Sequence, residues 1–327
     1  MKLWYLPLEH IDSRYTVLMD KQIRETLCQR GIEFEAIEGE RLTDRIDNGA
    51  FLDSEDTNFF KASQIQNVAR AFRSGRVHDG DKFFISDLWF PGLEAIPYMA
   101  LFRKVHVEIW SIAHAGSWTD TDFVGELKDW VKFTEKGWFS LCSGVFVGSE
   151  FHRIDIVRKG RCSDIKKIHN TGLVFDTRDL LSQVPPPFEK RDLVVMAGRL
   201  DDEKQPWLFD ELASHFPGVE FIKTYEKGLS KLEYFKLLSQ AKVIFSAALQ
   251  ENFGYAVLEA ATFGVTPVVP DRLAYTNIWP SDCRYSDMKE AVRLTEKFLK
   301  RPLNVTCVAE YYNGSFLRML KIMGFLD

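Results

Sequence analysis

Residues 251–269, ENFGYAVLEAATFGVTPVV, decide the fold of this chain. A short apolar run, VIFSAAL (243–249), precedes them, so the order predicts a buried strand, a turn and a helix that opens near Gly254. The first N–H groups of that helix point back at the turn, where they and the helix dipole stabilise an anion such as a diphosphate. Glu251 on the turn and Glu259 in the helix can each accept hydrogen bonds from hydroxyl groups. Two hydroxyl-rich groups on either side of a diphosphate describe a sugar nucleotide.

A second segment upstream, LVVMAGRLDDEKQP (193–206), predicts a strand that continues into a charged turn. The two segments together resemble the donor-binding domain of retaining glycosyltransferases of the GT-B architecture, the group 1 or family 4-like enzymes with an E-x7-E motif. Glu251 and Glu259 match that motif, and Arg199 and Lys204 match the two cations that hold the donor diphosphate. A solvated charged turn is the alternative reading of the two cations.

The resemblance implies an α/β fold with two Rossmann-like, doubly wound domains that face each other across a cleft. It is clear over roughly residues 190–275 and only topological before them. It implies that Glu251 contacts the donor sugar and Glu259 the nucleotide ribose, whereas Gln205 stands where the family commonly has glycine. Because the helix around Glu259 is apolar almost all round, this carboxylate needs a partner. The residues assigned to catalysis are Arg199, Lys204, Glu251 and His114, and those assigned to the donor are Gly198, Tyr225, Asn252, Phe253, Gly254, Tyr255 and Glu259.

His114 stands in SIAHAGSW (111–118), at the end of a predicted strand of the first domain. In related enzymes a histidine or another polar residue of this loop approaches the transferred sugar. The small neighbours Ala115, Gly116 and Ser117 would permit close approach of a ligand. The alternative is a loop histidine that is satisfied by partners within the protein.

Strand-like runs alternate with helical patterns along the chain, which predicts βα units and parallel sheets. The stiff, proline-rich segment VPPPFEKRD (184–192) marks the boundary between an acceptor-binding domain, 1–183, and a nucleotide-sugar-binding domain, 193–306. The last segment, 307–327, has an amphipathic helical pattern, and by resemblance we expect it to cross back onto the first domain.

Candidate residues for binding the acceptor are predicted from the positions of loops and from local positive charge. In LEHIDSRY (8–15) no glycine is present, so the loop either recognises the acceptor or simply caps a helix at Ser13. The run 152–167 is the one basic concentration, which is either a solvated face or a surface that follows a phosphate backbone. Asp120 and Asp122 are read as a helix cap rather than a metal site. The residues assigned to the acceptor are His10, Asp12, Arg14, Ser117, Arg158 and Arg161.

Composition limits the alternatives. The chain of 327 residues has a net charge of -5, so no global charge favours nucleic acid or a membrane. Its five cysteines are scattered and without CxxC spacing, which indicates reduced thiols in a cytoplasmic setting and no zinc site. The N-terminus does not read as a signal peptide, and no apolar run approaches the ~20 residues that cross a bilayer.

The sequence therefore predicts a hexosyl- or pentosyltransferase that moves a sugar from a nucleotide-sugar donor, with UDP the favoured nucleotide, to a hydroxyl acceptor with retention. No cofactor and no metal are expected, since the nucleotide-sugar is a co-substrate and two side-chain cations and a helix terminus stabilise the leaving group. A soluble small molecule or a glycan is the first acceptor class, and a hydroxymethylated DNA base, as in bacteriophages, is the second. The hypotheses of another class are a nucleotide-sugar-binding protein without turnover and a nucleic-acid-binding protein.

Overall fold

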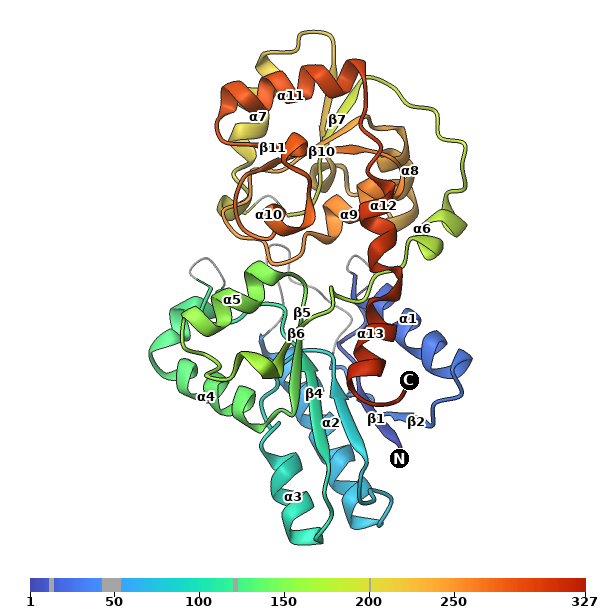
Figure 1. Cartoon of the computed structure of the whole chain (residues 1–327), viewed down its shortest axis with the longest axis vertical. Coiled ribbons are helices and arrows are strands. Elements are labelled where there is room, and N and C mark those ends of the chain that lie inside the picture. Colours follow the sequence, from blue (N-terminus) through green and yellow to red (C-terminus); the bar gives the residue numbers. More distant parts are fainter. Residues whose placement is uncertain (12–14, 43–53, 120–122, 200) are drawn as a thin grey trace. The chain divides into compact units, whose positions relative to one another are not determined.

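The computed structural model describes residues 1–11, 15–42, 54–119, 123–199 and 201–327 (Figure 1). The chain divides into two compact units. Unit 1 comprises Met1–Val147, Arg153–Thr171 and Leu317–Asp327, and unit 2 comprises Gly148–His152 and Gly172–Phe316. Each unit has one sheet whose strand pairs are parallel, which confirms the predicted α/β fold of two Rossmann-like, doubly wound domains.

Unit 1 has a six-stranded sheet in the order β2-β1-β3-β4-β5-β6. Its strands are β1 (Leu3–Leu6), β2 (Phe34–Ala36), β3 (Lys82–Ile85), β4 (Glu108–Ile112), β5 (Gly144–Val147) and β6 (Ile168–Asn170). Its helices are α1 (Thr16–Gln29), α2 (Ser54–Arg73), α3 (Ala95–Arg103), α4 (Lys128–Leu141) and most of α5 (Glu150–Arg158), with the short 3-10 turns η1 (Phe123–Leu127) and η2 (Ile165–Lys167).

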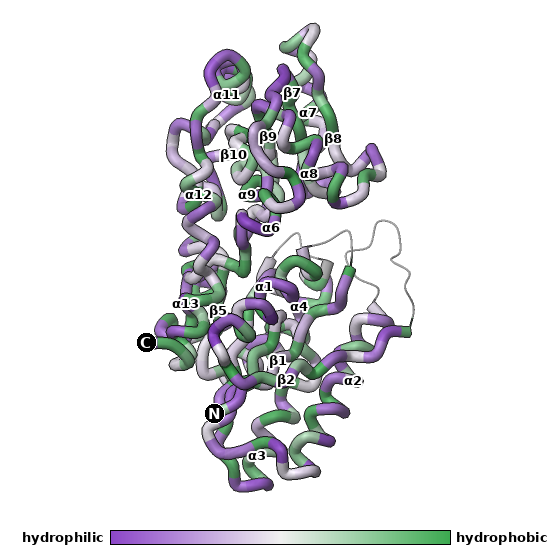
Figure 2. The backbone as a smooth tube through the Cα atoms, turned by 90° about the vertical axis from the view of Figure 1, so that its right-hand side faces the viewer, coloured by the Kyte–Doolittle hydropathy of each residue, from purple (hydrophilic) through white to green (hydrophobic). Residues whose placement is uncertain are grey.

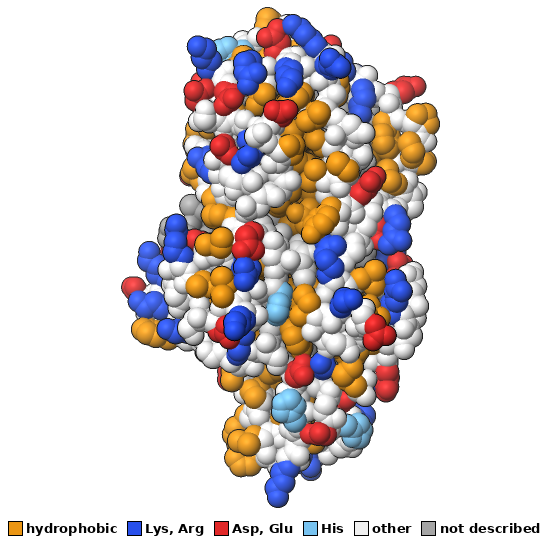
Figure 3. Space-filling view, viewed as in Figure 1, with side chains coloured by type: hydrophobic (Ala, Val, Ile, Leu, Met, Phe, Trp, Pro, Cys, Tyr) orange, Lys and Arg blue, Asp and Glu red, His pale blue; other side chains and the backbone are white. Residues whose placement is uncertain are grey.

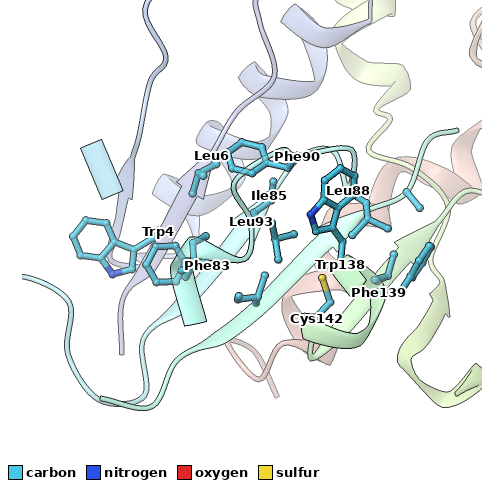
Figure 4. Packing of buried hydrophobic residues seen from close by; sticks show 14 of the residues in the cluster. Trp4, Leu6, Phe83, Ile85, Leu88, Phe90, Leu93, Trp138, Phe139 and Cys142 are labelled. Atoms are coloured by element: carbon cyan, nitrogen blue, oxygen red, sulfur yellow. The ribbon is translucent and has the colours of Figure 1, made fainter. Parts of the chain in front are cut away.

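The core of unit 1 lies along the central strands, where apolar runs rather than alternating patterns are buried. All four residues of β1 are buried, as are all four of β5. Figure 4 shows Trp4 of β1 and Phe83 of β3 side by side, with ring centroids 6.0 Å apart, and Trp138 and Phe139 of α4 in the same cluster. Strands with two covered faces are expected to read as continuous hydrophobic runs, which is how these segments read in the sequence.

Unit 2 has a five-stranded sheet in the order β11-β10-β9-β7-β8. Its strands are β7 (Leu193–Met196), β8 (Glu220–Lys223), β9 (Val243–Phe245), β10 (Thr266–Pro270) and β11 (Arg284–Tyr285). Its helices are α6 (Thr177–Gln183), α7 (Pro206–Ser214), α8 (Lys231–Gln240), α9 (Tyr255–Thr262), α10 (Tyr275–Ile278), α11 (Met288–Lys300), α12 (Thr306–Glu310) and the beginning of α13 (Ser315–Ile322), with the 3-10 turns η3 (Asp202–Lys204), η4 (Thr224–Lys227), η5 (Ser281–Cys283) and η6 (Tyr311–Gly314). Figure 2 shows the hydrophobic stretches of the backbone in green.

Segments on both sides of the proline-rich stretch belong to unit 2 because they pack on its helices. Helix α6 contacts α8 and α9, and α12 contacts α9. The sequence-based boundary placed residues 172–183 in the first domain, whereas they lie in unit 2. The terminal segment Leu317–Asp327 belongs to unit 1, where the Arg318 guanidinium donates to the Thr171 carbonyl at 2.8 Å. Among the described helices, none combines the length and the apolar character needed to span a bilayer.

Each sheet has one switch point. This is the place between two adjacent strands from which the chain continues toward opposite edges of the sheet. In unit 1 this point lies between β1 and β3, and in unit 2 it lies between β7 and β9. Ligands of doubly wound sheets bind outside the carboxyl ends of the strands at such points. The loops that follow these four strands are therefore the places to look for a functional site.

Candidate functional site

The switch point of unit 2 brings together the two predicted motifs, although they are far apart in sequence. Lys204 follows β7 and Glu251 follows β9, and the Lys204 ammonium lies 3.4 Å from a Glu251 carboxylate oxygen. The same ammonium donates to the Gln250 carbonyl at 3.1 Å. Both side chains are about one-fifth exposed (20% and 23%), so they are ordered by the protein and still accessible to a ligand.

The turn before α9 orients Glu251. The other carboxylate oxygen of Glu251 accepts hydrogen bonds from the backbone N–H groups of Phe253, at 3.3 Å, and Gly254, at 2.9 Å. Gly254 has a φ of 83°, in the left-handed region that glycine adopts without strain, and α9 begins at the next residue. Two of the amides that the sequence assigned to the donor phosphates therefore serve Glu251 in this structure. A phosphate could use them only if this carboxylate turned away.

Arg199 is held by the acidic residues of its own turn. Its guanidinium lies 2.5 Å from an Asp201 oxygen and 3.4 Å from a Glu203 oxygen. Glu203 also lies 3.6 Å from the Lys204 ammonium, so one carboxylate stands between the two predicted diphosphate ligands. The sequence interpretation missed Glu203, because DDEK is equally typical of a solvated turn. A donor diphosphate would compete with these carboxylates for the same two cations.

Gln205, where glycine was expected, has a backbone conformation that glycine adopts without strain. Its φ is 49° and its ψ is 56°, in the left-handed region where a side chain is disfavoured. The loop keeps this shape because the Arg272 guanidinium donates to the Gln205 side-chain oxygen at 3.2 Å and to the carbonyls of Ala247 and Ala248 at 3.0 and 3.1 Å. Arg272 thus ties together the loops after β7 and β9, a role that sequence spacing does not reveal.

Glu259 is buried and has the partners that its apolar surroundings require. The Lys231 ammonium lies 2.8 Å from one oxygen, and the Tyr234 hydroxyl donates to the other at 2.8 Å. Burial, together with the neighbouring Glu259 carboxylate, raises the pKa of Tyr234 well above its usual value, so the hydroxyl stays a donor. Both partners come from α8, three residues apart, so they lie on one face of that helix. Sequence reasoning missed them, although their spacing was a usable signal.

The remaining donor residues lie around these loops with varied exposure. Tyr225 is 53% exposed and lies in η4, just after β8. The Tyr255 hydroxyl donates to the Val174 carbonyl at 3.2 Å, and the Asn252 carbonyl accepts from the Ser149 hydroxyl at 2.8 Å. Gly198 has a φ of 104°, which glycine alone adopts readily. Phe253 is buried, with its ring centroid 4.9 Å from that of Tyr312.

In unit 1, His114 is fixed by two partners within the protein. Its Nε2 lies 2.9 Å from the Ser86 carbonyl and its Nδ1 lies 3.3 Å from the Tyr15 hydroxyl. A carbonyl can only accept, so Nε2 carries the proton and Nδ1 accepts from Tyr15. Burial lowers the pKa of His114, which favours this neutral form. The predicted contact of His114 with the sugar would require the ligand to share these bonds or replace one of them.

The switch point of unit 1 has a second charged group that the sequence did not single out. Lys61 of α2 is buried, its ammonium lies 3.1 Å from Asp87, which follows β3, and it also donates to the Trp89 carbonyl. Glu9, which follows β1, accepts from the Thr57 hydroxyl at 3.2 Å, and burial raises the pKa of Glu9. Asp87 also accepts from the Trp89 N–H at 3.2 Å, so of these two carboxyl groups Glu9 has fewer donors within the described residues.

The predicted acceptor residues that the structure describes differ in exposure and in their partners within the protein. His10 is exposed and lies 2.9 Å from an Asp20 oxygen. Ser117 is 2% exposed, and its N–H and hydroxyl donate to the two oxygens of buried Glu135 at 2.7 and 2.5 Å. Arg158 is 77% exposed and Arg161 is half-buried. The other predicted residues in this class, Asp12 and Arg14, lie outside the described residues, as do Ser13, Asp120 and Asp122.

Comparison with known proteins gives a short sequence match and broad structural matches. No family model matches the chain. A 74-residue part is 34% identical to the tRNA-queuosine alpha-mannosyltransferase of Drosophila melanogaster, and it spans 23% of this chain and 20% of that relative. The structure of sucrose-phosphate synthase from Thermosynechococcus elongatus superposes with a TM-score of 0.64 at 11% identity, over 99% of this chain and 96% of that one.

A variant of S. aureus TarM, in complex with fondaparinux, alpha-GlcNAc-glycerol and UDP, superposes with a TM-score of 0.52 at 15% identity. That match covers 79% of this chain and 55% of the TarM chain. The chain has the GT-B fold of these glycosyltransferases. At these identities the likeness establishes the fold, and the resemblance deduced from the two sequence motifs is thereby confirmed at the level of architecture.

Proposed function

We propose that this GT-B chain is a retaining glycosyltransferase that moves a sugar, a hexose or a pentose, from a nucleotide-sugar to a hydroxyl acceptor. The observation that carries the proposal is the meeting of Lys204 and Glu251, 3.4 Å apart, at the switch point of unit 2. A cation for a diphosphate and a carboxylate for a sugar hydroxyl thus stand together where a doubly wound sheet binds its ligand. UDP is the favoured nucleotide, which agrees with the UDP in the TarM complex.

In the proposed reaction Arg199 and Lys204 bind the departing diphosphate and stabilise the charge that develops on it. The bond from the anomeric carbon to the diphosphate oxygen breaks, and a bond from that carbon to the acceptor oxygen forms on the same face. The acceptor proton passes to the departing oxygen, so no side chain has to act as a nucleophile. Glu251 orients the sugar. Glu259 binds the ribose hydroxyls, which replace Lys231 or Tyr234 as one of its hydrogen-bond partners.

The proposal uses neither a metal nor another cofactor, because two side-chain cations supply the electrostatic stabilisation. The test is a panel of nucleotide-sugars and free nucleotides in a thermal-shift assay, followed by release of the nucleotide from the best donor with and without EDTA. A ligand at one thousand times its dissociation constant should add about 4 kcal/mol of stability. A chain that binds no nucleotide-sugar, or binds one without any turnover onto an acceptor panel, would not be this enzyme. Strict dependence on a divalent metal would overturn the metal-free part.

For the acceptor we keep a small molecule or a glycan as one class and a nucleic-acid base as the second. The second class is favoured by the relative whose name states that it acts on queuosine in tRNA. The experiment is transfer of a labelled sugar onto glycan acceptors, onto unfractionated tRNA and onto duplex DNA with hydroxymethylpyrimidines. Incorporation into a nucleic acid that falls steeply with salt would support the second class. Incorporation only into small acceptors would eliminate it.

A further inference from the structure

Helix α4 carries an exposed surface that the proposed reaction does not use. We define the α4 surface as the side chains Lys128, Trp130, Lys132, Phe133 and Lys136. Trp130 is 62% exposed and Phe133 is 70% exposed. Figure 3 shows cationic and hydrophobic side chains together over the part of unit 1 where Figure 1 labels α4 and α5.

The helix period arranges these side chains in two stripes. The buried residues Val131, Glu135 and Trp138 fix the inward face of α4. Lys128, Lys132 and Lys136 are four residues apart, so they form a cationic stripe with about 6 Å between successive residues along the axis. Trp130 and Phe133 are three residues apart and form an aromatic stripe beside it.

The lysines of this surface lack acidic partners. Within the described ranges, no carboxylate lies within ion-pair distance of Lys128, Lys132 or Lys136, although the chain as a whole is acidic. The Lys132 ammonium instead lies 5.3 Å from the centre of the Phe133 ring, so a cation stands next to an exposed π face. Such unpaired charge beside an exposed ring is complementary to a partner that has both phosphates and flat aromatic groups.

The basic run predicted from sequence lies next to the same helix. The Lys167 ammonium donates to the carbonyls of Ser140, at 3.1 Å, and Cys142, at 3.0 Å, at the C-terminal end of α4. Lys166 of the same run is exposed, and so is Arg158, whose nearest ion-pair contact is 3.8 Å from Asp155. Unit 1 therefore has further accessible cations in the segment that contacts the C-terminal end of α4.

We propose that the α4 surface docks a nucleic acid with unpaired bases, the lysines contacting phosphates and Trp130 and Phe133 stacking on bases. This rests on the proposed function only in that the docked nucleic acid would be the acceptor. Glu126 and Asp129 are exposed on the same part of the chain. If Trp130 and Phe133 entered a bilayer, these two carboxylates would lose water with them, which costs much free energy. Interfaces with nucleic acid retain water, so the carboxylates could stay hydrated there. Nucleic acid is therefore favoured over an anionic lipid surface.

The test is fluorescence anisotropy of the full chain with labelled single strands of about 20 nucleotides, RNA and DNA, and with the matching DNA duplex. The first variant is Lys128→Glu with Lys132→Glu and Lys136→Glu. Its matched control is Lys289→Glu with Arg293→Glu and Lys297→Glu on α11, which has the same spacing and the same charge change. No large hydrophobic side chain is exposed on the described α11. The second variant is Trp130→Ala with Phe133→Ala.

The salt slope is the slope of the logarithm of the binding constant against the logarithm of the salt concentration, measured between about 50 and 200 mM salt. The α4 charge reversal should lower its magnitude by about 2 to 3, whereas the α11 reversal should change it by less than about 1. The aromatic variant should weaken single-strand binding by about tenfold or more and affect the duplex less. Circular dichroism should show unchanged folding, since all the substituted side chains are on the surface.

Three results would overturn the docking proposal: no binding of any strand at about 50 mM salt, equal losses in the α4 and α11 variants, or α4-dependent binding to phosphatidylserine vesicles that exceeds binding to nucleic acid. The two proposals can fail separately. Donor binding and turnover onto a small acceptor, without nucleic-acid binding, would remove only the docking surface. Binding of nucleic acid that depends on α4, without any sugar transfer, would remove only the proposed reaction.

Discussion

Replacing Glu259 by glutamine tests the donor site most directly. The carboxylate is 5% exposed and is held by the Lys231 ammonium and the Tyr234 hydroxyl, each at 2.8 Å. Glu259→Gln keeps the size of the side chain and removes its charge. Tyr234→Phe is the matched control, because it keeps the carboxylate and removes one of its donors.

Both variants should lose similar stability. A hydrogen bond to a charged group contributes about 1.5–3 kcal/mol, so Tyr234→Phe should lower the free energy of unfolding by about 2 kcal/mol. Glu259→Gln weakens the ion pair with Lys231, but this lysine is 24% exposed and water screens part of that interaction. We therefore expect about 2 kcal/mol for this variant as well. Urea unfolding of the two proteins measures these values.

Only Glu259→Gln should lose nucleotide affinity. If the carboxylate accepts hydrogen bonds from the ribose hydroxyls, loss of its charge should cost about 1.5–3 kcal/mol of binding free energy. The dissociation constant for UDP should then be roughly 10- to 150-fold larger. Tyr234→Phe should stay within about threefold of the wild type, since its carboxylate remains. Isothermal titration calorimetry with UDP separates the two. The assignment of Glu259 would be refuted if both variants bound UDP equally well or lost affinity equally.

Three further predictions concern the loops and one half-buried lysine, Lys190. Arg199→Ala and Lys204→Ala should each lower turnover by about a hundredfold or more with the fold intact, and near-normal initial rates in both would remove the leaving-group role. Gln205→Val should lower the free energy of unfolding by about 1–2 kcal/mol more than Gln205→Gly, because its φ of 49° disfavours a branched side chain, and equal melting curves would contradict this. Burial lowers the pKa of Lys190 to about 8, whereas its usual value is near 10.4. Between these two pH values the unfolded chain binds more protons than the folded chain. The wild type should therefore gain stability relative to Lys190→Met as the pH rises through this window. Urea unfolding at two pH values in that window checks the last prediction, and parallel pH responses of the two proteins would exclude it.

Much of the fold could be predicted from the sequence because it depends on local patterns. The buried strands read as short apolar runs, and the glycines that end helices are recognisable by their neighbours. The turn at Gly254 has the left-handed conformation that its place between a strand and a helix requires. Gln205 stood out because glycine was expected there, and its positive φ is the conformation that glycine adopts without strain. The roles assigned to Arg199, Lys204, Glu251 and His114 in catalysis stay predictions.

The sequence alone determined the succession of strands and helices, the class of fold and the two motifs with their carboxylates and cations. Those features follow from side-chain periodicity and backbone preference, which act over a few residues. Only the tertiary structure decided that Lys204 meets Glu251, that Lys231 and Tyr234 hold Glu259, and that Glu203 separates the two cations. The contact of Lys204 with Glu251 depends on strand order, because β7 and β9 become neighbours although β8 lies between them in sequence. A local pattern fixes which residues belong to a loop, whereas the order of strands in the sheet fixes which loops meet.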